Sequence, residues 1–201
     1  MFRMTDHRIR KRITDKQTNA GEMIENKIGT YFLKLTTKAT RFRRTMMRLI
    51  SITEDNWMEV ASLSVKEEQK KYVAPAIGIL ARGYVYRDCN VKIYAFENDG
   101  VIVGTALVRE FTDEPLGYDL QQFMIDEQYQ RKGYGSRALQ QILDELRKEG
   151  HYDHVELCVK KADIEAIRLY EKHGFVDSGY VDEDLPDSLN MICYLSEKNN
   201  C

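Results

Sequence analysis

The seven residues 130–136 constrain the fold of this chain most, because they place two closely spaced glycines between a strand pattern and a helix pattern. In order they are Gln130, Arg131, Lys132, Gly133, Tyr134, Gly135 and Ser136. Glycine lets backbone amides approach an anion, a helix N-terminus carries partial positive charge, and Arg131 and Lys132 add full charges. The segment contains neither the Gly-Lys-Ser/Thr of a Walker loop nor Gly-x-Gly-x-x-Gly. It therefore predicts a cradle for a diphosphate.

The rest of the chain predicts a mixed α/β (α+β) domain. Alternating apolar and β-branched residues predict strands over 48–52, 92–97, 101–110, 118–125, 155–159, 175–181 and 191–195. Helical spacing predicts helices from an N-cap at Thr53, over 66–72 before Pro75, over 77–86, through Leu139 and Leu146 to Gly150, and over 164–172. This order predicts a mostly antiparallel central sheet flanked by helices.

Charge divides the chain into two unlike parts. Residues 1–46 carry 12 Lys and Arg against 4 Asp and Glu, a balance of +8, and residues 47–201 carry 18 against 28, a balance of −10. The first part has few large apolar residues, so we expect a basic N-terminal extension over 1–46 and one domain over 47–201. We expect a solvated tail or a loosely attached helix. A nucleic-acid-binding arm and a natural start at Met46 or Met47 stay open as alternatives.

Composition excludes several classes of protein. A chain with 43% hydrophobic and 31% charged residues is neither disordered throughout nor fibrous. It has no apolar run long enough to span a membrane and no signal-peptide pattern, so we expect a cytoplasmic protein without a membrane partner. The cysteines are widely spaced and the histidines do not pair at ligand spacing, so we expect idle or buried thiols and no metal site.

Two segments resemble the signatures of the GNAT superfamily of N-acetyltransferases. Residues 130–135 are similar to its acetyl-CoA loop, Gln/Arg-x-x-Gly-x-Gly/Ala, and residues 166–175, AIRLYEKHGF, are similar to its AIxLYEKxGF segment. The resemblance covers roughly residues 48–197. Within the family, residues 65–75 look like the helical segment near the acceptor site of bacterial spermine/spermidine (diamine) acetyltransferases.

The resemblance implies a fold and a way to bind acetyl-CoA. The strand before the loop would be splayed from its neighbour, so that its backbone pairs with the pantetheine arm. An amide near Met124 or Ile125 would polarise the thioester carbonyl, and residues 130–136 would hold the phosphates. Asp163 stands where many relatives have Asn, and is either a cofactor contact or only a helix N-cap. Tyr170 matches the general acid, since a phenol is protonated at pH 7 and can donate to sulfur.

The general base is less well defined. Several polyamine acetyltransferases have a carboxylate at the position of Gln121, and glutamine cannot accept a proton. Asp119, two residues earlier on the same predicted strand face, can act through water, so we assign it a catalytic role and Gln121 a substrate contact. Glu68, on the acceptor-side helix, is a second candidate and a substrate contact. We expect Cys158 to be a buried core thiol, not an acetyl carrier.

Charge and resemblance together predict the acceptor. The balance of −10 over residues 47–201 would attract a polycation. We therefore expect direct acetyl transfer, in a ternary complex, to a primary amine of spermidine or spermine. Two alternatives stay open: another amine, such as a protein N-terminus, an amino acid or an aminoglycoside, and a CoA-binding sensor without catalysis. The sequence leaves the oligomeric state open; the resemblance makes a homodimer one possibility, because dimers are frequent in this family.

Overall fold

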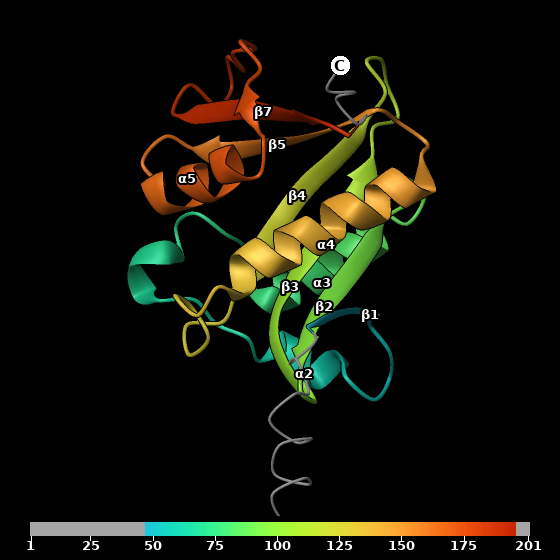
Figure 1. The fold of residues 1–201 in the computed structure, drawn as a ribbon, viewed down its shortest axis with the longest axis vertical. Coiled ribbons are helices and arrows are strands. Elements are labelled where there is room, and N and C mark those ends of the chain that lie inside the picture. The colour runs from blue at the N-terminus through green and yellow to red at the C-terminus, as the bar shows by residue number, and fades with distance from the viewer. Residues whose placement is uncertain (1–46, 196–201) are drawn as a thin grey trace, which may run out of the picture. The chain divides into compact units, whose positions relative to one another are not determined.

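One seven-stranded sheet forms the centre of the computed structural model, which describes residues 47–195. Its strand order is β1-β2-β3-β4-β5-β7-β6, and Figure 1 shows the arrangement. The strands are β1 Arg48–Ser51, β2 Lys92–Asn98, β3 Val101–Glu110, β4 Tyr118–Ile125, β5 His154–Lys160, β6 Val176–Asp177 and β7 Ser188–Tyr194. All neighbours pair antiparallel except β4 and β5, which are parallel. The mixed, mostly antiparallel sheet is thereby confirmed.

Helices cover both faces of the sheet. They are α2 Trp57–Ala61, the 3-10 helix η1 Glu67–Gln69, α3 Ala76–Val85, α4 Tyr134–Glu149 and α5 Ile164–Lys172. Apolar residues of α4 and α5 pack with β3, β4, β5 and β7 in one core cluster, and those of α2 and α3 pack with β2, β3 and β4 in a second. In Figure 1, α4 crosses in front of the sheet and α3 lies behind it. Apolar residues recur every three or four positions along α4, and those on this face, such as Leu139 and Leu143, are fully buried.

The contact between β4 and β5 is short, and this positions the site. The two strands pair only at Tyr118 with Val155 and at Asp119 with Glu156, after which they separate. The β3–β4 register also shifts, because Leu107 pairs with Gln122 whereas Val108 pairs with Leu120. Gln121 is therefore an extra residue on β4, a β-bulge. The expected splay of the strand before the glycine loop is confirmed.

Three expected elements differ from the structure. The first helix begins at Trp57, not after an N-cap at Thr53, because Asn56 binds the turn: its Oδ1 accepts from Thr53 N (2.8 Å) and its Nδ2 donates to the Ser51 carbonyl (2.9 Å). The helix expected over 66–72 is only the three-residue η1.

The strand expected over 175–181 is limited to β6, since the chain turns at Gly179, which has a φ of 76°.

Among the described residues, no helix is long and apolar enough to cross a membrane.

Candidate functional site

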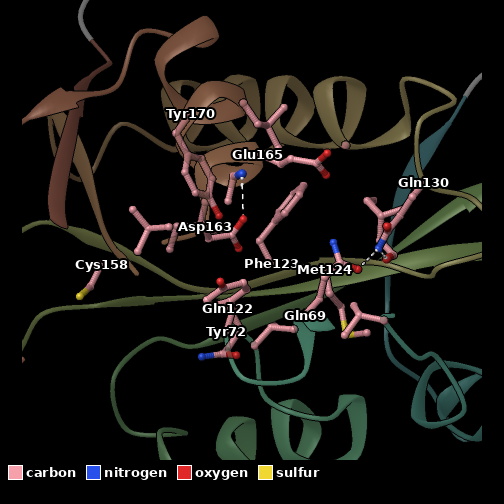
Figure 2. Close-up of a pocket in the computed structure, with 18 of the residues that line it drawn as sticks. Gln69, Tyr72, Gln122, Phe123, Met124, Gln130, Cys158, Asp163, Glu165 and Tyr170 are labelled. Carbon is pink, nitrogen blue, oxygen red and sulfur yellow. Dashed lines mark hydrogen bonds between the residues drawn. The ribbon is translucent and has the colours of Figure 1, made fainter. Parts of the chain in front are cut away.

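A cavity of about 270 Å³ opens where β4 and β5 separate. Its walls come from residues 120–125 of β4, the C-terminal half of β5, the glycine loop, α5 and the segment before α3. In Figure 2, Tyr170 and Asp163 lie on one side of β4, and Gln69 and Tyr72 lie on the other. The cavity is therefore a place where a ligand can contact one strand edge and side chains from both faces of the sheet.

Tyr170 is buried at the wall that α5 contributes. Its side chain is 8% exposed, and its ring lies 5.6 Å from that of Phe175. Burial raises the pKa of the Tyr170 phenol well above its usual value, and the nearby charge of Asp163 raises this pKa further. A phenol in this environment stays protonated over the physiological pH range and can donate a hydrogen to an anion that forms in the cavity.

The segment before α3 lies across the cavity and is held at three points. Gln130 Nε2 donates to Gln69 Oε1 (2.9 Å) and also to the Ile125 carbonyl (3.0 Å). Ala74 N donates to Gln122 Oε1 (3.1 Å), and the Tyr72 hydroxyl donates to the Ala162 carbonyl (3.4 Å) on the far side. These contacts join the segment to the glycine loop, to β4 and to the turn before α5.

The glycine loop ends at the N-terminus of α4, which has no side-chain cap. Gly133 occupies the N-cap position with a φ of 79°, and an added Cβ there would meet no atom within 4 Å. Arg131 Nη2 pairs with Glu165 Oε1 (2.5 Å), but these side chains are 74% and 66% exposed. An exposed pair contributes little to stability, so a diphosphate could displace it. The loop thus offers backbone amides and a cation to an anion.

The structure brings most, but not all, of the expected site residues to the cavity. Those that line it are Gln121, Met124, Ile125, Gln130, Arg131, Gly135, Asp163 and Tyr170. Those outside its lining are Glu68, Asp119, Lys132, Gly133, Tyr134 and Ser136. The last four adjoin it in the loop and the first turn of α4, where the Ser136 hydroxyl lies 2.7 Å from His173 Nε2.

Asp119 lies apart from the cavity, in an ion pair. Its Oδ2 accepts from Arg109 Nε (2.8 Å), and its side chain is 13% exposed. Burial raises the pKa of Asp119, although the bond from Arg109 lowers it. We expected Asp119 and Gln121 on the same face of the strand because side chains alternate between the two faces. The bulge at Gln121 interrupts this alternation. The catalytic role of Asp119 stays a prediction.

Cys158 is exposed, so the expectation of a buried thiol at this position is wrong. Residues 155, 157 and 159 of β5 face the core, whereas Cys158 faces the uncovered side and lines the cavity. The lining also includes Gln122 and Glu165, for which we expected no role, and Gln69 and Tyr72, which belong to the segment 65–75 that the resemblance placed near the acceptor site. Glu165 had a local signal too, since it follows Asp163 by two residues in the first turn of α5.

A family comparison agrees with this geometry. The model of the acetyltransferase (GNAT) family matches residues 48–175, so the chain belongs to that family. It is 28% identical over 142 residues to the spermine/spermidine N(1)-acetyltransferase of Bacillus subtilis strain 168, covering 66% of this chain and 89% of that protein.

Solved structures share the fold at lower identity. Spermidine N-acetyltransferase from Vibrio cholerae, in complex with CoA and spermine, is 17% identical with a TM-score of 0.61, over 74% of this chain and 95% of that one. The ribosomal-protein-S18-alanine N-acetyltransferase of Escherichia coli is 21% identical with a TM-score of 0.56, over 77% of this chain and 97% of that one. At these identities the likeness establishes the fold only.

Proposed function

We propose that this protein transfers an acetyl group from acetyl-CoA to a primary amine of a polyamine, spermidine or spermine, by direct attack in a ternary complex. The observation that carries the proposal is the position of Tyr170 in the cavity between the separated strands β4 and β5. Family membership identifies an acetyltransferase, and the proposal goes beyond it by naming the acceptor substrate.

The described residues fit acetyl-CoA. Beyond Asp119, β4 has no β5 partner, so its backbone edge can pair with the amides of the pantetheine arm. The open backbone at Gly133 and the uncapped N-terminus of α4 suit a diphosphate. An amide of Met124 or Ile125 would then polarise the acetyl carbonyl, and Tyr170 would protonate the departing thiolate.

The choice of a polyamine rests on charge and on a relative. Residues 47–201 carry a balance of −10, which favours the approach of a polycation. The curated relative that matches 66% of this chain is named for spermine and spermidine. Gln121, with a buried Oε1 that has no hydrogen-bond partner among the described residues, would bind the acceptor in the cavity. Glu68 would pair with a remote ammonium group.

A protein N-terminus is the second candidate acceptor. One of the solved structures with this fold is named for the alanine of ribosomal protein S18. A peptide acceptor needs an open groove, and the contacts of Gln69 and Tyr72 across the cavity narrow it in this protein. We therefore favour the small, flexible polyamine.

One assay tests the proposed function. The protein is incubated with acetyl-CoA and spermidine, spermine, amino acids, an aminoglycoside or an alanine-terminated peptide, and release of the CoA thiol is followed. We expect turnover with the polyamines only. Tyr170→Phe should lower kcat about 10²–10³-fold, because phenylalanine keeps the packing on Phe175 but has no proton to donate. Turnover of the peptide alone would identify the other acceptor, and tight CoA binding without turnover of any amine would contradict an enzyme.

A further inference from the structure

Two carboxylates line the cavity, and one of them is partly buried. Among the described residues that line it, Asp163 and Glu165 are the acids. Glu165 is 66% exposed and is paired with Arg131. Asp163 is partly buried and lies beside Tyr170, as Figure 2 shows. An ammonium group that enters the cavity between the strands therefore meets Asp163 as its partly buried acid.

Asp163 has one oxygen engaged and one available. Its Oδ1 accepts from Ala166 N (3.2 Å), which caps α5, and no donor to Oδ2 is present among the described residues. The other ionisable groups that line the cavity are Glu165 and Tyr170 of α5, Arg131 of the loop, Tyr72 of the segment before α3, and Cys158 of β5. The residues of β4 that line the cavity are uncharged.

These surroundings suit a proton acceptor. Burial raises the pKa of Asp163 above its ordinary value, the bond from Ala166 N lowers it, and the charge of Glu165 raises it again. A carboxylate with a raised pKa is a stronger base than a solvated one. An alkyl ammonium has a pKa of about 10.4, so it reacts at pH 7 only if a base removes its proton.

We propose that Asp163 is the general base of the reaction and takes a proton from the bound ammonium group, directly or through one water molecule. This inference rests on the proposed function, because it requires an amine acceptor. It gives Asp163 a role beyond cofactor contact or helix capping, and it assigns the base to the cofactor side of the cavity. Asp119 and Glu68, the other candidates, lie outside the cavity lining.

The protons balance over the whole reaction. Asp163 takes one proton from the ammonium, and the amine nitrogen then forms a bond to the acetyl carbon. The C–S bond breaks, its electron pair stays on sulfur, and Tyr170 gives the thiolate a proton. Protonated Asp163 returns its proton to the Tyr170 oxygen, and the remaining proton on the nitrogen leaves to water. The products are the acetylated amine, the CoA thiol and one solvent proton.

The two residues also assist each other electrostatically. Burial raises the pKa of Tyr170, and the negative charge of Asp163 raises it further before the reaction. Once Asp163 has accepted a proton this charge disappears, and the pKa of Tyr170 falls. Tyr170 therefore becomes the stronger acid at the step in which the thiolate leaves.

The test is the pH dependence of kcat with saturating spermidine in Asp163→Asn. Asparagine keeps the oxygen that caps α5 but cannot accept the proton. Wild-type kcat should reach a plateau above the pKa of Asp163. In the variant kcat at pH 7 should fall about 10²–10³-fold and rise about tenfold per pH unit toward the amine pKa of about 10.4, while the Kd for acetyl-CoA changes less than about threefold.

Three further variants make the result decisive. Asp163→Glu should recover part of the plateau, since it restores a carboxylate. Asp88→Asn, an exposed acid outside the cavity, should leave the pH profile unchanged. Asp119→Asn tests the other candidate base. The inference is overturned if Asp163→Asn keeps the wild-type profile, if it loses only acetyl-CoA affinity, or if Asp119→Asn alone abolishes the plateau. A wild-type protein that acetylates no amine would instead overturn the proposed function.

Discussion

The hydrogen bonds that a buried carboxyl group accepts determine whether its pKa is raised or lowered in this domain. Asp119 and Asp163 have raised pKa values because burial outweighs their hydrogen bonds. Burial also acts to raise the pKa of Glu110, but hydrogen bonds from His151 and Asn90 outweigh it and lower this pKa. A raised pKa suits a group that exchanges protons, whereas a lowered one marks a carboxylate that stabilises the fold as an anion.

The first prediction concerns Glu110, which joins three parts of the fold. Its Oε1 lies 2.8 Å from His151 Nδ1 and accepts from Asn90 Nδ2 at 2.6 Å. Because its folded pKa is lowered, its stabilisation is present at neutral pH and is lost as pH falls through that pKa. Glu110→Gln should cost about 1–2 kcal/mol of unfolding free energy at pH 7, with a smaller difference at pH 4, measured by urea denaturation.

Glu145→Gln is the matched control for this measurement. Glu145 pairs with Lys148 on the surface of α4 at 3.3 Å and is 51% exposed. Its loss should cost no more than about 0.5 kcal/mol at either pH. Equal losses for the two variants, or a Glu110→Gln loss that does not change with pH, would show that Glu110 acts only through packing.

At the scale of elements, local sequence patterns predict the strands and helices around the site better than they predict the long-range contacts within it. The bounds of β4 and α5 agree with those expected from the sequence, because each has a clear apolar period and a turn or glycine at its ends. The bulge at Gln121 and the short η1 depend on long-range partners. The resemblance placed residues 65–75 near the acceptor site, but the contacts of Gln69 and Tyr72 could not be predicted, because Gln130 and Ala162, which hold them, lie about 60 and 90 residues away.

The second prediction concerns the contact between β3 and β4 at Gly104. An added Cβ there would lie 2.4 Å from the Met124 carbonyl and 2.8 Å from the Phe96 ring. The β4 backbone would have to move, so Gly104→Ala should destabilise the protein by about 1–3 kcal/mol, or roughly 3–10 °C in Tm. It should also raise the KM for acetyl-CoA, because Met124 lines the cavity.

Gly78→Ala provides the comparison for Gly104. Gly78 lies in α3, and an added Cβ would meet its nearest atoms at 3.8 Å, an ordinary contact. Alanine is the better helix former, so this variant should be as stable as the wild type or more stable by about 0.5–1 kcal/mol. Equal Tm losses in both variants would contradict close packing at Gly104.

A third prediction concerns the glycine loop. Gly133 has a φ of 79°, a conformation that alanine adopts at a cost of about 1 kcal/mol. Relief of this strain would turn the loop amides away from the diphosphate, so Gly133→Ala should raise the KM for acetyl-CoA about 5–30-fold, measured by initial rates. Gly179→Ala has the same strain, at a φ of 76°, but lies outside the cavity lining, and should lower Tm without changing that KM.

At the scale of the whole molecule, the near-neutral net charge of −2 combines two opposite parts. The family model begins at residue 48, and the described fold begins at residue 47. The basic residues 1–46 lie outside the described residues, so their role as an extension stays a prediction. All the residues to which we assign chemistry lie within the acidic part, between Glu68 and Tyr170. Catalysis should therefore not require the extension.

Deletion of residues 1–46 tests whether catalysis needs the basic extension. The deletion should stop before Met47. Met47 is 3% exposed within the core, and its carbonyl accepts from Gln141 Nε2 (2.6 Å), so a chain that starts at Met47 keeps both contacts. We expect kcat with spermidine to stay within about twofold of the full chain. The KM should be equal or lower, because removing a charge of +8 strengthens attraction of a polycation, and this gain should disappear at 0.5 M salt. A large loss of kcat at unchanged Tm would instead show that residues 1–46 complete the site.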